Sequence, residues 1–207
     1  MSKNCIYGIN GPVVTVKNST DFSMLEMVYV GKERLIGEVI GIDSTDTTIQ
    51  VYEDTAGLAP GEPVESSGLP LSLTLGPGII SNIFDGIERP LRDIAAAEGS
   101  FITRGCDVPA LDTEKKWNVT LKVKVGDKLC GGDIYATCPE TVSVEHRIML
   151  HPELCGEIVY AAPDGEYTVN DKIAELMDET GAVHTLTLTQ KWPIRNPRPI
   201  KQRLECS

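Results

Sequence analysis

Residues 75–91 read "LGPGIISNIFDGIERPL", and this stretch decides between two classes of fold. A short apolar strand runs into Gly76-Pro77-Gly78 and a helix-like segment follows, which is the order found in a phosphate-binding loop. That loop needs G-x-x-x-x-G-K-[ST], because backbone N–H groups hold the phosphates, the lysine reaches the β and γ groups and the hydroxyl holds magnesium. Here no lysine follows until Lys115, and Pro77 has no N–H to donate. The glycines are therefore predicted to turn a corner and not to bind a phosphate.

The residues before this corner have the pattern of a small antiparallel β-structure. "GPVVTV", "MLEMVYV", "RLIGEVIGI" and "TTIQVYE" each resemble a strand, and glycine and proline residues recur along the region, as in "GLAPGEPV". In "TTIQVYE", Ile49 and Val51 fall on one face and the polar residues on the other. Residues 1–70 are therefore predicted to form a compact β-barrel or sandwich.

Residues 71–100 change in character. The strand "LSLTL" leads into the corner, the helix-like "IISNIF" follows, and "LRDIAAAEG" is predicted to be a second helix. Pro90 suits the first turn of this helix and Gly99 suits its end.

Residues 111–190 are predicted to be β-rich with one helix. "TLKVKVGDKL" alternates as a strand should, and its apolar face would hold Leu121, Val123 and Val125. "VHTLTLTQKW" also alternates strictly and predicts one final strand. Between them, "DKIAELMDET" has helical spacing, with Asn170 as its N-cap. The apolar stripe of that helix would consist of Ile173, Leu176 and Met177.

The last segment, residues 191–207, is predicted to be extended because three prolines exclude a helix or a central strand. Its basic residues are Arg195, Arg198, Lys201 and Arg203. No aromatic residue follows Trp192, so the stacking groups of a nucleic-acid-binding arm are missing.

Composition narrows the classes of partner. The formal net charge of -11 argues against a nucleic-acid or anionic-membrane surface, both of which need basic patches. No apolar run has the length of a signal peptide core or of a membrane-spanning helix. We therefore expect a cytoplasmic location, peripheral to a membrane if the chain joins a membrane complex, with no direct insertion.

Few side chains are candidates for chemistry. The six cysteines include no C-x-x-C pair and are predicted to be free thiols, with a metal site at His146, His151 and Cys155 as the alternative. Glu53 and Asp54 are adjacent at a strand end, where neighbouring side chains point to opposite faces, so they are not expected to share a proton. No catalytic residue, cofactor-binding residue or metal ligand is assigned.

One region resembles a biotinyl or lipoyl carrier domain. The resemblance lies in "VGDKLCGGDI", the hairpin "ETVSVE", and then "CGEI" and "YTVNDKI". A carrier needs a lysine at the hairpin tip, because its amine forms the amide bond to the cofactor. No lysine occurs between Lys128 and Lys172. The segment is therefore predicted to keep the fold without the carrier activity.

Nearly the whole chain, from Gly11 to about Arg203, resembles the catalytic A subunit of V/A-type rotary ATPases. The blocks that carry the resemblance are "LIGEVIGIDSTDTTIQVYEDTAGLAPGEPVESSGLPLSLTLGPGIISNIFDGIERPL", "ETVSVEHRIML", "GEYTVNDKIAEL" and "QKWPIRNPRP", in that order. The "FDGIERPL" part of the first block contains Asp85 and Arg89, for which we expect a packing role.

The resemblance implies a mainly β chain in four parts. Residues 1–70 would be the crown β-barrel, residues 71–110 the start of the α/β nucleotide-binding domain, residues 111–190 an inserted barrel-sandwich bulge, and residues 191–207 an extended return segment. Implied partners are B subunits in an alternating ring and peripheral-stalk subunits at the bulge. The complete subunit would use Mg-ATP to couple ATP synthesis or hydrolysis to proton or sodium transport. This chain ends before any P-loop, so it is expected to act in assembly and not as an enzyme.

Overall fold

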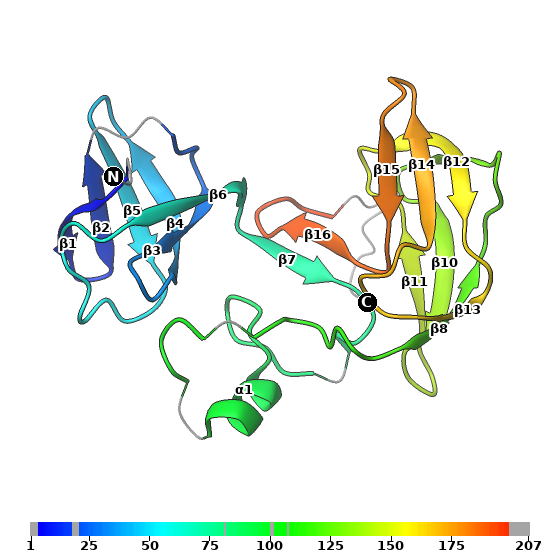
Figure 1. Ribbon diagram of the computed structural model, residues 1–207, viewed down its shortest axis with the longest axis horizontal. Helices are drawn as coiled ribbons and strands as arrows, with labels where there is room; N and C mark the ends of the chain where they lie inside the picture. Colours follow the sequence, from blue (N-terminus) through cyan, green and yellow to red (C-terminus); the bar gives the residue numbers. More distant parts are fainter. Residues whose placement is uncertain (1–3, 18–20, 81, 100–101, 107, 199–207) are drawn as a thin grey trace, which may run out of the picture. The chain divides into compact units, whose positions relative to one another are not determined.

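The computed structural model describes residues 4–17, 21–80, 82–99, 102–106 and 108–198 (Figure 1). The chain divides into two compact units. The first unit comprises Met1–Ser72 and Asp93–Asp107, and the second comprises Leu73–Arg92 and Val108–Ser207. Each unit has its own cluster of buried apolar side chains.

The first unit is built on one six-stranded antiparallel sheet with the order β1-β2-β5-β4-β3-β6. Its strands are β1 (Ile6–Asn10), β2 (Val13–Lys17), β3 (Glu26–Val30), β4 (Leu35–Ile42), β5 (Asp46–Val51) and β6 (Val64–Pro70). The predicted alternation in β5 is confirmed, since Ile49 and Val51 are buried while Gln50 and Tyr52 are exposed. The β-branched residues of β2, β3 and β5 supply most of this core, which suits a pleated surface.

The two edge strands of this sheet, β1 and β6, meet over a short stretch. Cys5 and Pro63 form an isolated antiparallel bridge. The Ile6 N–H donates to the Glu62 carbonyl at 2.9 Å, and the Val64 N–H donates to the Asn4 carbonyl at 3.0 Å. These bonds cover edge groups that would otherwise be open to pairing with another chain. The predicted β-structure is confirmed as a sheet, without a continuous closing ladder between its edges.

The second unit contains three sheets. One has the order β11-β10-β8-β13, one the order β15-β14-β12-β9, and a third pairs β16 with β7. Figure 1 shows β14 between β15 and β12. The strands are β7 (Ser72–Leu75), β8 (Trp117–Leu121), β9 (Lys128–Cys130), β10 (Ile134–Pro139), β11 (Glu145–Met149), β12 (Cys155–Ala161), β13 (Gly165–Tyr167), β14 (Ala174–Asp178), β15 (Val183–Leu186) and β16 (Gln190–Pro193).

The helix predicted at "LRDIAAAEG" is confirmed as α1 (Leu91–Glu98), the one helix in the described part of the chain. Pro90 precedes it directly. Gly99 ends it with a positive φ of 91°, and its N–H donates to the Ala95 carbonyl at 3.1 Å. This conformation suits glycine because a Cβ would be strained there.

The helix-like reading of "IISNIF" was wrong. The described residues of this segment form turns and an isolated bridge between Phe84 and Pro90. The Leu91 N–H donates to the Ile83 carbonyl at 2.9 Å, and the Asp85 N–H donates to the Arg89 carbonyl at 3.1 Å. These bonds fold residues 83–91 back on themselves, which leaves no room for a continuous helix.

The helix predicted at residues 171–180 was also wrong, because its centre is β14. This strand pairs with β12 on one side and with β15 on the other. Ala174 and Leu176 are fully buried, whereas Met177 is 40% exposed. Two flanking strands satisfy the backbone on both sides, and this pairing overrides the helical propensity of the segment. The bulge region, predicted to contain one helix, therefore has none among its described residues.

Two predicted strands are shorter than expected. β8 ends at Leu121, and Val125 beyond it is 65% exposed because the chain turns there, with Gly126 at a φ of 94°. "VHTLTLTQKW" is split into β15 and β16 by residues 187–189. At this break the Thr187 carbonyl accepts a 2.6 Å hydrogen bond from the buried Tyr135 hydroxyl. That side-chain bond takes the place of a ladder bond.

The return segment after β16 is described as far as Arg198. It turns at once, since the Asn196 N–H donates to the Pro193 carbonyl at 3.0 Å and the Asn196 carbonyl accepts from the Trp192 indole at 2.7 Å. Lys201, Arg203 and Cys206 lie outside the described residues. Within the described part of the chain, no helix is long and apolar enough to cross a membrane.

Candidate functional site

The glycine corner is a site where backbone groups approach closely. A Cβ on Gly76 would lie 2.9 Å from a Leu111 methyl group and 3.0 Å from a Thr189 methyl group, so a larger residue there would have to displace these side chains. Gly78 has a φ of 109°, which favours glycine. The corner predicted from the sequence is therefore required by both packing and backbone conformation.

The N–H groups of this corner bind an anion that belongs to the protein itself. One carboxylate oxygen of Glu140, Oε1, accepts from the Gly78 N–H at 2.7 Å and from the Ile80 N–H at 3.0 Å. The other oxygen, Oε2, lies 2.9 Å from Nδ1 of His146. The Glu140 side chain is only 1% exposed. Successive backbone N–H groups form anion-binding concavities, and here the Glu140 carboxylate of the same chain occupies the concavity.

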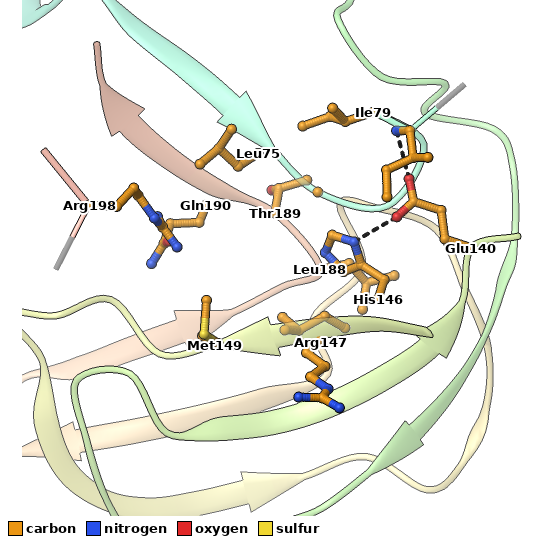
Figure 2. Close-up of a pocket in the computed structure, with 13 residues that line it drawn as sticks. Leu75, Ile79, Glu140, His146, Arg147, Met149, Leu188, Thr189, Gln190 and Arg198 are labelled. Atoms are coloured by element: carbon orange, nitrogen blue, oxygen red, sulfur yellow. Dashed lines mark hydrogen bonds and ion pairs between the residues drawn. The ribbon is translucent and has the colours of Figure 1, made fainter. Parts of the chain in front are cut away.

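A pocket of about 320 Å³ opens beside this carboxylate (Figure 2). Its apolar wall includes Leu75, Ile79 and Leu188. Its polar and charged lining residues are Glu140, His146, Arg147, Thr189, Gln190 and Arg198. Figure 2 shows the His146 ring joined to Glu140 by a dashed line. No lysine or cysteine is among the described residues that line it.

The two arginines of this pocket are not directed at Glu140. Arg198 donates to the Gln190 side-chain oxygen at 2.9 Å and stacks over the Trp192 ring at 4.3 Å. Arg147 is exposed, and in Figure 2 its guanidinium points away from Glu140. The arrangement can hold a carboxylate and fix a loop, but among the described residues that line this pocket there is no lysine amine of the kind that a phosphate-binding loop uses.

Glu53 and Asp54, the adjacent carboxylates just after the end of β5, form hydrogen bonds with different backbone groups. Each of the two carboxylates accepts a hydrogen bond from a backbone N–H group, which the sequence did not indicate. Glu53 accepts from the Gly105 N–H at 3.0 Å, and Asp54 accepts from the Ala56 N–H at 2.9 Å. Both carboxylates hold loops of the first unit.

The alternative metal site at His146, His151 and Cys155 does not assemble. His146 contacts Glu140, whereas His151 stacks against Trp192 with ring centroids 5.5 Å apart. Cys155 lies opposite Cys130 on the neighbouring strand. Among the described residues no group of three or more His, Cys, Asp or Glu side chains could hold a metal ion. None of the described cysteines, Cys5, Cys106, Cys130, Cys138 and Cys155, is in a disulfide bond.

Asp85 and Arg89 have the packing role expected for them. Asp85 Oδ2 accepts from Arg89 Nε at 2.7 Å, and Oδ1 accepts from the backbone N–H groups of Arg89 and Ile87 at 2.8 and 3.0 Å. Burial raises the pKa of the Asp85 carboxyl, but these hydrogen bonds outweigh it and hold the pKa below its usual value. Nearby, burial raises the pKa of Glu88, which accepts from the Thr74 N–H at 2.6 Å.

The lowered pKa of Asp85 predicts a pH-dependent contribution to stability. A carboxyl whose pKa is lower in the folded state stabilises the protein above its unfolded pKa, and this contribution is lost as the pH falls through the folded pKa. Asp85→Asn is expected to cost about 1 kcal/mol of unfolding free energy at pH 7. The difference from the parent chain should shrink below about pH 4. Urea unfolding at pH 7, 5, 4 and 3 checks this, and parallel stability curves would contradict it.

Two contacts between residues far apart in the chain were not predicted from the sequence. Glu140 was considered only as part of a hairpin that lacks a lysine, and its contact with the corner spans 62 residues. No local motif signals such a contact. The pairing of Cys130 with Cys155 was missed because its register depends on where β9 and β12 begin.

Comparison with known proteins agrees with this architecture. Residues 6–68 match the family described as "ATP synthase alpha/beta family, beta-barrel domain", and residues 108–195 match "ATPsynthase alpha/beta subunit barrel-sandwich domain". The "V-type ATP synthase alpha chain" of Halothermothrix orenii is 52% identical over 98% of this chain. The A subunit of the A-type ATP synthase of Methanopyrus kandleri is 51% identical over 98% of it. The catalytic A subunit of the V-type proton ATPase of Cyanidium caldarium is 46% identical over 100% of it.

The matched region is about a third of these relatives, since the alignments cover 34%, 34% and 35% of their respective lengths. The two domain matches occur in the same order as the two units' sheets along the chain. The identity of about half is continuous across both units. The chain therefore belongs to the ATP synthase alpha/beta family, among the A (alpha) subunits of the V/A type.

Proposed function

We propose that this chain is the N-terminal part of the catalytic A subunit of a V/A-type rotary ATPase, to which it contributes assembly surfaces. The complete subunit would bind Mg-ATP and couple ATP synthesis or hydrolysis to proton or sodium transport, in the cytoplasm and peripheral to the membrane. The observation that carries an assembly role for this chain is the filled glycine corner. The N–H groups of Gly78 and Ile80 are already bound to the buried Glu140 carboxylate, so they are not available to a phosphate.

The two units would serve different partners. We assign residues 1–70 to the crown, where they would join B subunits in an alternating ring. Residues 111–190 would be the bulge that docks on peripheral-stalk subunits. Residues 71–110 and 191–207 would belong to the nucleotide-binding domain of the complete subunit. The hairpin between β10 and β11 supports a docking role for the bulge, because Val142 at its tip is fully exposed.

A capture experiment with purified B and stalk subunits tests this division. The chain should capture both, and Val142→Asp should weaken capture of the stalk subunits by about tenfold while leaving capture of B unchanged, since a buried apolar contact at an interface is worth about 1–2 kcal/mol. Because the tip is exposed, this variant should fold like the parent chain, and circular dichroism serves as the check.

Capture of neither partner by the folded chain would contradict the assembly role. Loss of both partners on Val142→Asp would contradict the separate assignment of the two units. Calorimetry with Mg-ATP at millimolar concentration tests the alternative that this chain still binds nucleotide as an enzyme would, and we expect no heat of binding.

A second candidate is a binding module of the carrier-domain type. The paired sheets of the second unit and the β10–β11 hairpin favour it structurally. The tip consists of Thr141, Val142 and Ser143, which offer no amine for an amide bond. Incubation with a biotin or lipoate ligase should therefore leave the mass of the chain unchanged.

A further inference from the structure

Two cysteines face each other across neighbouring strands in the second unit. Cys130 is the last residue of β9, an edge strand, and Cys155 is the first residue of β12. They are direct partners in the antiparallel register, and the next pair is Gly156 with Leu129. Both cysteines are free and exposed, whereas Leu129 is buried. The two thiols therefore lie on the outer face of the sheet.

The backbone hydrogen bonds of Cys130 show which kind of antiparallel residue pair Cys130 and Cys155 form. Its N–H donates to Oδ2 of Asp133 at 2.8 Å, and its carbonyl accepts from the Asp133 N–H at 3.0 Å. Cys130 therefore does not exchange both backbone hydrogen bonds with Cys155. A pair of this non-hydrogen-bonded kind has Cα atoms about 4.5 Å apart and side chains close together. That spacing falls in the range of about 4.4–6.8 Å that a disulfide requires.

Glycines hold the backbone next to both cysteines. A Cβ on Gly131 would lie 2.2 Å from the Pro152 carbonyl oxygen, and a Cβ on Gly156 would lie 2.2 Å from the Met177 carbonyl oxygen. Such contacts leave no space for any other residue. The thiols of Cys130 and Cys155 are themselves within hydrogen-bonding distance of each other, so a bond between them needs little movement of the backbone.

We propose that Cys130 and Cys155 are a dithiol that forms a reversible cross-strand disulfide by exchange with a low-molecular-weight disulfide. A groove of about 270 Å³ lies directly beside the pair and gives such a reagent access. The bond would tie the edge strand β9 to β12 and would close a loop that contains the β10–β11 hairpin.

The exchange proceeds in two balanced steps. One cysteine thiolate attacks a sulfur of the small disulfide, breaks its S–S bond and releases one small thiolate. The second cysteine then attacks the protein sulfur of the mixed disulfide, forms the Cys130–Cys155 bond and releases the other small thiolate. The two protein thiols lose two electrons and two protons, and the small disulfide is reduced to two thiols.

The charged groups around Cys130 and Cys155 determine which small disulfide reacts faster with these thiols and how the reaction rate depends on pH. The hydrogen bond to Cys155 raises the pKa of the Cys130 thiol, as do burial and the charges of Asp133 and Glu179. The charged residues that line the groove are Lys128, Glu157, Asp178 and Glu179, and Asp133 lies next to Cys130 outside it. Four carboxylates against one lysine disfavour the thiolate and repel anionic reagents. A neutral disulfide should therefore react faster than an anionic one, and the rate should rise about tenfold per pH unit below the thiol pKa.

The test uses the full chain, 2-hydroxyethyl disulfide as the neutral reagent and oxidised glutathione as the anionic one. After equilibration, mass spectrometry of peptides should show the 130–155 link, and a reducing thiol should remove it. The thermal midpoint of the second unit should rise by about 5–10 °C in the linked form, since the bond closes a loop of about 26 residues.

Matched variants make the outcome decisive. Cys130→Ser and Cys155→Ser should each abolish the link and instead accumulate a mixed disulfide at the remaining exposed thiol. Cys5→Ser, in the other unit, should leave the link intact. The proposal is overturned if the parent chain forms mixed disulfides at both Cys130 and Cys155 in excess reagent but no link between them. It is also overturned if neither thiol reacts in the folded chain.

Discussion

Replacing Glu140 by alanine is expected to lower the unfolding free energy of the second unit by about 3 kcal/mol. The side chain is 1% exposed and holds the N–H groups of Gly78 and Ile80 as well as His146. Alanine would leave the half-buried Gly78 N–H without an acceptor, which costs about 1–3 kcal/mol, and would also remove the hydrogen bonds of Glu140 to the exposed Ile80 amide and to His146. Both tryptophans, Trp117 and Trp192, belong to the second unit, so their fluorescence in urea reports this transition selectively.

Two matched variants distinguish the effect of losing the Glu140 carboxylate from the effect of any substitution in this hairpin. Glu140→Gln keeps one acceptor oxygen and should cost less than Glu140→Ala. Glu145→Ala removes an exposed carboxylate on the same hairpin and should change stability by less than about 0.5 kcal/mol. Hydrogen exchange at the Gly78 and Ile80 amides should speed up in Glu140→Ala alone. Equal losses for Glu140→Ala and Glu145→Ala would show that the corner does not depend on this contact.

Replacing Leu176 by alanine is expected to cost about 3 kcal/mol, whereas replacing its neighbour Met177 should cost less than about 1 kcal/mol. Leu176 is fully buried in the core of the second unit, and Met177 is 40% exposed on the opposite face of β14. Truncating a buried leucine removes its transfer free energy and leaves a cavity, while truncating an exposed side chain does neither.

This pair of variants tests the strand directly. On a helix, Leu176 and Met177 would share one apolar stripe with Ile173, and truncating either would cost a similar amount. On a strand, consecutive side chains point to opposite faces. Tryptophan fluorescence in urea measures both variants, and similar losses in the two would contradict the strand assignment.

Much of the first unit was predictable from the sequence. The strands at residues 26–30, 35–42 and 46–51 have regular apolar patterns and β-branched residues, and the turn between the first two begins with Gly31. The helix α1 was also predictable from the sequence, because the flanking Pro90 and Gly99 mark its bounds. In these segments local preference and the final fold agree, so the local pattern was sufficient.

The errors in the second unit have a common cause. Residues 173–177 fit helical spacing as well as strand alternation, and the pairing with β12 and β15 decided between the two. At residues 187–189 strict alternation continues in the sequence, but the contact of Tyr135 with the Thr187 carbonyl interrupts the ladder. In each case at least one partner, β12 or Tyr135, lies more than ten residues away in the chain.

The sequence by itself determined the strand-rich character of this chain, the family it belongs to and the absence of a phosphate-loop motif at the glycine corner. These follow from residue types at short spacing, because the chemistry of a proline or a lysine does not depend on the fold around it. Only the tertiary structure decided that the corner holds the Glu140 carboxylate and that Cys130 faces Cys155. Both depend on contacts between residues far apart in the chain, and such contacts exist only once strand order and register are established.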